Sequence, residues 1–164
     1  MDLNLCWSYY QKAEKLVNQG HWPEAHYLFE QVLAYLPQHL HHAAQHVQIK
    51  PCQLVCLISG LRDCAVYQSE ILNTMGQQKN AYQVLNQSYA LLQFLSIENN
   101  PLVRSVASVL DRNSHDLLEH MNAFCHAQRT ASWQLEYANV EKAHRYFTQL
   151  KHQQGQMTAG ARLN

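Results

Sequence analysis

Hydrophobic positions along the chain recur at three- and four-residue steps, which is the period of an amphipathic helix. Over residues 3–19, for example, Leu5, Tyr9, Ala13 and Leu16 fall on one helical face. The sequence contains no alternation of β-branched and polar residues long enough to indicate a strand. The pattern therefore predicts an all-α protein.

Glycine and proline mark where the predicted helices begin and end. Gly20 and Gly76 each end a helix, because glycine readily adopts the left-handed conformation that closes one. Pro23 begins the second helix, where its fixed φ fits the first turn, and Pro37 ends that helix. The other predicted helices cover 51–75, 80–95, 101–110, 114–137 and 140–151, with a turn at 111–114 and a short helix or loop at 39–47.

These elements form three predicted helical hairpins, broken at Gly20, at Gly76 and near Ala138. The length of 164 residues suits one domain, which we expect to cover 1–153. Gly155 and Gly160 lie in the remaining segment, 154–164, for which we predict a flexible tail.

The first hairpin resembles a tetratricopeptide repeat (TPR), a family whose pattern places small, aromatic and turn residues at fixed offsets. The matching positions are Tyr9, Ala13, Leu16, Gly20, Trp22, Ala25, Phe29, Val32 and Pro37. The second hairpin matches at fewer positions, which are Leu72, Gly76, Ala81 and Leu85, and the third mainly at Ala143, Phe147 and Leu150. The resemblance extends to small bacterial TPR-like families. It implies a single TPR-like domain of about three antiparallel hairpins, of the right-handed superhelical type. The intervals between the breaks exceed the family's period of about 34 residues, which favours a compact array with long first helices.

The resemblance also implies a binding groove, because TPR proteins use recurring positions on the first helix of each hairpin to line a concave surface. The first two hairpins place Trp7, Tyr10, Glu14, Val17, Asn18, Asp63, Val66, Glu70, Asn73 and Thr74 there. The third hairpin adds Gln128, Ser132, Leu135 and Glu136. Such a groove is acidic and aromatic, and it fits a protein partner that presents a neutral-to-basic peptide or amphipathic helix. The competing interpretation is that the carboxylates form a solvated face and that Trp7 and Tyr10 belong to the core.

Charge and targeting signals exclude several classes of protein. Twelve Lys and Arg balance twelve Asp and Glu, without the basic stripe that nucleic-acid binding requires. There is no run of about 18 apolar residues for a membrane span. The N-terminus lacks the basic and apolar regions of a signal peptide, so we expect a cytoplasmic protein whose five cysteines are reduced and buried.

The candidates for chemistry in this sequence are weak. His39, His41, His42 and His46 lie close together, and a spacing of four allows two imidazoles to share a metal on a helix. Paired ligands of the usual zinc spacing are missing, so we expect surface histidines, no metal and no cofactor. Glycine-rich phosphate loops and nucleophile elbows are also missing, which favours a non-enzymatic adaptor or chaperone. The alternatives are a self-associating structural subunit, for example a homodimer, and a His-rich metal-binding bundle.

Overall fold

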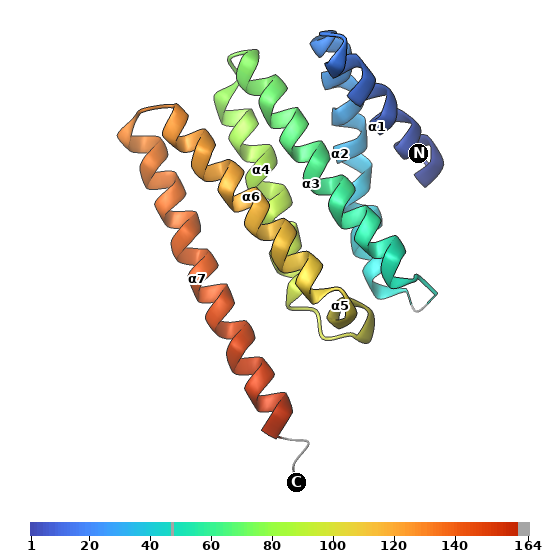
Figure 1. Ribbon diagram of the computed structural model, residues 1–164, viewed down its shortest axis with the longest axis vertical. Helices are drawn as coiled ribbons and strands as arrows, with labels where there is room; N and C mark the ends of the chain where they lie inside the picture. Colours follow the sequence, from blue (N-terminus) through green and yellow to red (C-terminus); the bar gives the residue numbers. More distant parts are fainter. Residues whose placement is uncertain (47, 161–164) are drawn as a thin grey trace. The chain divides into compact units, whose positions relative to one another are not determined.

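The computed structural model describes residues 1–46 and 48–160, and these residues are almost entirely helical (Figure 1). No strand occurs among them, so the prediction of an all-α protein is confirmed. The helices are α1 (Leu3–Asn18), α2 (Trp22–Gln45), α3 (Pro51–Thr74), α4 (Gln78–Ser96), α5 (Pro101–Ser105), α6 (Ala107–Ala127) and α7 (Ala131–Gly160). None of these described helices combines the length and the apolar content needed to cross a membrane.

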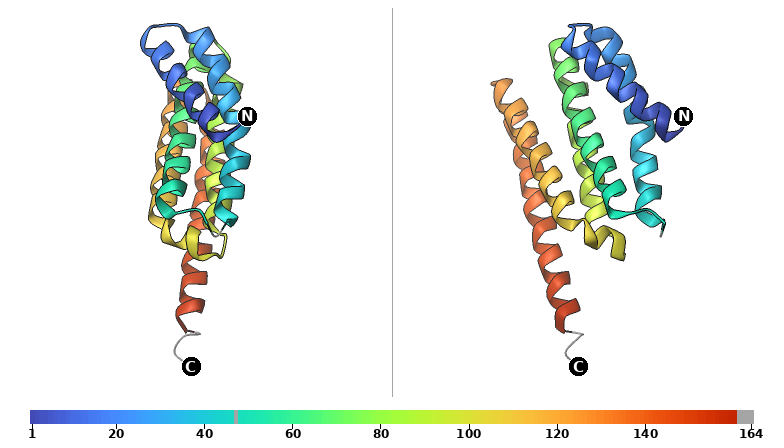
Figure 2. Two further views of the ribbon diagram at one scale, coloured as in Figure 1. Left: turned by 90° about the vertical axis from the view of Figure 1, so that its right-hand side faces the viewer. Right: turned by 45° about the vertical axis from the view of Figure 1, so that its right-hand side comes forward.

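The chain separates into two compact units, Met1–His120 and Met121–Asn164. The first unit contains α1 to α5 and the beginning of α6, and the second contains the end of α6 and α7. Within the first unit, α1 packs on α2, α2 on α3 and α3 on α4, while the short α5 contacts α2, α3 and α4 (Figure 2).

α1 and α3 end in the same backbone turn. Gly20 has a φ of +80°, its N–H donates to the Val17 carbonyl at 3.0 Å, and the N–H of His21 donates to the Leu16 carbonyl at 2.9 Å. This pair of bonds is the Schellman arrangement, in which a left-handed glycine satisfies the last carbonyls of a helix. The second turn repeats it at Gly76, whose φ is +77°, through bonds from Gly76 to Asn73 and from Gln77 to Leu72. Both predicted glycine turns are therefore confirmed.

Small residues bring the first two helices together. Ala13 of α1 and Ala25 of α2 are fully buried, and so is Phe29, one turn after Ala25. The Phe29 ring stacks on Tyr67 of α3 with ring centroids 5.5 Å apart, and Tyr10 of α1 meets it edge-on at 6.1 Å. One side chain of α2 thus joins α1, α2 and α3 in a common core.

The predicted end of the second helix at Pro37 is wrong, because α2 continues through Pro37 to Gln45. A proline inside a helix removes one backbone hydrogen bond and strains the preceding turn. Leu40, Ala43 and Ala44, beyond the proline, are all buried. Their burial offsets the lost bond, so the segment 39–45 belongs to α2.

The predicted turn at 111–114 is also wrong, since α6 is continuous there and the break falls at Val106. Asn113 and Ser114 are typical turn residues, yet both are buried in the helix. Asn113 Nδ2 donates to the Val109 carbonyl at 2.8 Å, so its amide is satisfied by the preceding turn of its own helix.

The break predicted near Ala138 lies instead at 128–130. α6 ends at Ala127, Arg129 adopts a φ of +52°, and α7 runs without interruption through Asn139. The helix also continues past the predicted end at Lys151 to Gly160, so 154–160 are helical and 161–164 lie outside the described residues. Gly155 does not end α7, because a glycine in a right-handed helix costs only about 1 kcal/mol relative to alanine.

Candidate functional site: the face formed by α1 and α3

Trp7 joins the first helix to the third. Its ring lies over Gly60 of α3, where an added Cβ would overlap Cη2 and come within 2.8 Å of Cζ3. Trp7 is therefore half-buried, and α1 approaches α3 closely only because position 60 has no side chain.

Tyr10, one turn further along α1, is also half-buried. It contacts Trp7 edge-on at a centroid distance of 5.7 Å and Phe29 at 6.1 Å. Burial raises the pKa of Tyr10 well above its ordinary value, and the nearby carboxylates of Asp63 and Glu14 raise it further. The two aromatic residues predicted for the groove thus divide their surface between the core and the solvent.

Carboxylates and the guanidinium of Arg62 lie beside these rings. Tyr67 Oη donates to Glu14 Oε1 at 3.3 Å, which ties α3 to α1. Arg62 Nε lies 2.8 Å from Asp63 Oδ1, and Arg62 Nη1 donates to Asp116 Oδ2 of α6 at 2.9 Å. Burial raises the pKa of Asp63, and so do Glu14 and Asp116, whereas Arg62 lowers it, with a net upward shift.

We name this surface the α1–α3 face; its residues are Trp7, Tyr10, Glu14, Arg62, Asp63, Tyr67 and Asp116. Four of them follow from the sequence, whereas Arg62, Tyr67 and Asp116 do not. Tyr67 lies four residues after Asp63, so helical spacing alone was a signal for it. Asp116 had no such signal, because its contact with Arg62 depends on the placement of α6.

The remaining residues predicted for the first two hairpins of the groove lie on the same two helices, α1 and α3. Glu70 lies near the Tyr67 hydroxyl and contributes to raising the pKa of Tyr67, after burial and Glu14. Of the others, Val17 and Val66 are half-buried, whereas Asn18, Asn73 and Thr74, at the ends of α1 and α3, are exposed.

The residues predicted for the third hairpin are not on a first helix. Gln128 lies in the turn between α6 and α7, and Ser132, Leu135 and Glu136 lie on α7. Their assignment to the groove depended on a predicted helix that continues to Tyr137, and that helix is wrong, because α6 ends at Ala127.

The histidines near the end of α2 are bound mostly to their own helix. Tyr35 Oη is 3.2 Å from His39 Nδ1, His42 Nδ1 is 2.8 Å from the Gln38 carbonyl, and His41 contacts Gln45. Among the described residues, no group of three or more His, Cys, Asp or Glu side chains lies together as a metal site requires.

The cysteines differ from the expectation in part. Cys6, Cys64 and Cys125 are buried free thiols, but Cys52 and Cys56 are exposed on the first turns of α3. Burial raises the pKa of Cys64 well above its ordinary value, which keeps that thiol protonated at neutral pH. The prediction that all five are buried is therefore wrong for two of them.

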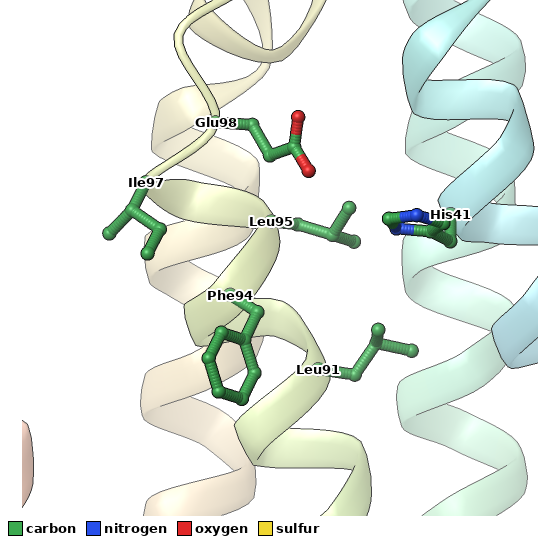
Figure 3. Close-up of a pocket in the computed structure, with 6 residues that line it drawn as sticks. All are labelled: His41, Leu91, Phe94, Leu95, Ile97 and Glu98. Carbon is green, nitrogen blue, oxygen red and sulfur yellow. The ribbon is translucent and has the colours of Figure 1, made fainter.

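A pocket of about 520 Å³ lies between α2 and α4 (Figure 3). Leu91 and Leu95 of α4 point toward His41 of α2, while Phe94 and Ile97 are exposed by 63% and 41%. Its lining is mostly apolar, and its two titratable residues are His41 and Glu98.

Comparisons of the chain with protein-family models, with curated proteins and with solved structures give no match.

Replacing Asp63 is expected to stabilise the protein. Because the pKa of Asp63 is raised, its protonated form favours the folded state; that contribution is complete below the ordinary pKa of 3.8 and is lost as the pH rises through the folded value. Asp63→Asn does not titrate, so we expect it to unfold at a higher temperature than the wild type at pH 7, with a difference that shrinks near pH 3. Thermal unfolding followed by circular dichroism at both pH values measures this.

Glu24→Gln, which changes an exposed carboxylate on α2, is the control and should leave the unfolding temperature nearly unchanged. Loss of stability in Asp63→Asn at pH 7 would mean that attraction to Arg62 outweighs burial and repulsion.

Proposed function

We propose that this protein is a TPR-like, non-enzymatic protein-binding module, an adaptor or chaperone that holds a neutral-to-basic peptide or amphipathic helix on the α1–α3 face. The observation that carries the proposal is the excess of negative charge there. Asp63 and Asp116 pair with the Arg62 guanidinium. Burial raises the pKa of Asp63, and the nearby carboxylate of Glu14 adds to that rise. A cationic side chain from a partner would relieve that repulsion.

The aromatic side chains supply the second part of the proposed interface. Trp7, Tyr10 and Tyr67 are half-exposed and held by contacts with each other, Phe29 and Gly60. Rigid aromatic surface loses little conformational entropy on binding and is enriched at binding hot spots. We expect the carboxylates to act on association rate and salt dependence and the rings to act on dissociation.

Support for the TPR-like class comes from the hairpin turns. Gly20 and Gly76 form the same two turn bonds, and each is followed five residues later by a fully buried alanine, Ala25 or Ala81. A cytoplasmic location is part of the proposal, because the exposed thiols of Cys52 and Cys56 persist in a reducing compartment.

The test begins with a partner recovered from the native cell by pull-down, whose affinity is then measured by calorimetry at two salt concentrations. Glu14→Lys combined with Asp63→Asn should weaken binding by about tenfold and flatten its salt dependence. Glu24→Lys changes the net charge by two units, against three for the combined variant, on an exposed part of α2 and should have little effect. Equal weakening by both variants, or by neither, would place the interface elsewhere.

Self-association is the second candidate function, and the exposed side chains of Phe94 on α4 and of Ile97, directly after that helix, favour it. Light scattering after size exclusion distinguishes it from partner binding. A dimer that Phe94→Glu converts to a monomer would support the self-associating subunit.

A further inference from the structure

A second pocket, of about 260 Å³, lies between α2, α3 and α4. Glutamine side chains and a carboxylate dominate its polar lining, and leucine and valine side chains supply its apolar walls. We name it the amide pocket. Its lining includes His26, Glu30, Gln68, Leu72, Gln83 and Gln87.

Gln68 lines this pocket and has an acceptor without a partner. The residue is only 3% exposed, and its Nε2 lies 2.8 Å from His26 Nδ1. In this orientation of the amide, Gln68 Nε2 donates the bond and His26 Nδ1 accepts it. Gln68 Oε1 has no hydrogen-bond partner, although a buried carbonyl oxygen normally has one.

The rim of the pocket is rich in acceptors. Glu30 lies one turn after His26 on α2 and carries an exposed carboxylate, and Gln83 and Gln87 line the side formed by α4. No Lys or Arg is among the described lining residues. An anionic ligand would therefore be repelled by Glu30 without a compensating cation from the lining. This excludes phosphates and carboxylates as ligands of the amide pocket.

A guanidinium carries five N–H donors, no acceptor and a positive charge, which complements this arrangement. An alkyl chain attached to it would contact Leu72 and the other apolar walls. We propose that the amide pocket binds an alkylguanidinium, with Gln68 Oε1 accepting at its base and the Glu30 carboxylate at its rim. The ligand is either a small guanidine or the arginine side chain of another protein. The inference does not depend on the α1–α3 face.

The experiment titrates the full chain with agmatine and, separately, with acetyl-Gly-Arg-Gly-amide, using calorimetry and the side-chain amide NMR signal of Gln68. Saturable binding that shifts this signal supports the proposal. Binding of agmatine but not of the peptide indicates a small-molecule ligand, and binding of the peptide but not of agmatine indicates an arginine of another protein. Binding of both probes supports the guanidinium as the group that they share. Butylamine, a point charge on a similar chain, should bind several-fold more weakly.

Glu30→Gln keeps the shape of an exposed residue and should weaken binding by about tenfold, whereas Glu24→Gln on the same helix should not change it. Gln68→Met removes the buried acceptor and should abolish the interaction; its unfolding temperature shows whether the fold is retained. The proposal is overturned if neither probe binds, or if Glu30→Gln binds as tightly as the wild type. Asp63→Asn on the α1–α3 face should leave the agmatine-induced shift of the Gln68 signal unchanged, so the two proposals fail separately.

Discussion

Phe29→Ala is expected to lower the free energy of unfolding by about 3–5 kcal/mol, the largest effect of any single change considered for this protein. Phe29 is fully buried, and its ring contacts Tyr67 of α3 and Tyr10 of α1. Truncation removes the transfer free energy of the ring and leaves a cavity that three helices cannot close together. Urea unfolding monitored by circular dichroism gives the difference.

Phe94→Ala is the matched control, because the same ring is deleted at a position that is 63% exposed. Away from the core, such a substitution normally changes the free energy of unfolding by no more than about 0.5 kcal/mol. Similar losses in the two variants would contradict the placement of Phe29 at the centre of the first three helices.

Gly60→Ala is expected to destabilise the protein by about 1–3 kcal/mol, the cost of overpacking a close contact. In an ordinary helix the same change stabilises by up to about 1 kcal/mol, since alanine is the better helix former. The sign reverses here because the new methyl group would overlap the Trp7 ring.

Two further variants isolate the contact between Gly60 and Trp7. Gly155→Ala places a methyl group on α7 where it meets nothing within 4 Å beyond the backbone of its own helix, so it should cause no loss of stability. Trp7→Ala removes the overlapping ring, so Gly60→Ala should cost less in that background than in the wild type. Additive effects of the two substitutions would show that α1 and α3 do not meet at these residues.

Local signals were enough to predict the two glycine turns. The backbone at Gly20 and Gly76 requires positive φ, and the periodic helices on either side leave little choice of where the chain reverses. The small residues Ala13 and Ala25 likewise indicated a close helix pair, and both are fully buried.

Helix ends that depend on tertiary burial were predicted in the wrong places. Pro37, a typical helix breaker, lies inside α2, because the residues after it reach the core. Arg129 takes the left-handed conformation of a turn without the glycine or asparagine that would have marked it. In both places the surrounding structure overrides the local preference of the residue.

The candidate site was predictable only where the hairpin register determines it. Trp7, Tyr10, Glu14 and Asp63 follow from that register, but the ion pair between Arg62 and Asp116 joins α3 to α6. The amide pocket had no sequence signal at all. Glutamine is abundant in this chain, and only the folded structure distinguishes the buried Gln68 from those on the surface.

The repeated turn gives this chain two segments that can be exchanged for one another. The segments 16–25 and 72–81 have equal length, begin with Leu, end with Ala and place Gly at the same point between them. Their turn bonds join the same relative positions, while the residues around the glycine differ in size and charge. A protein engineer can therefore treat these segments as interchangeable cassettes, and substitutions around either glycine can diversify the rim of a hairpin without altering the path of the backbone.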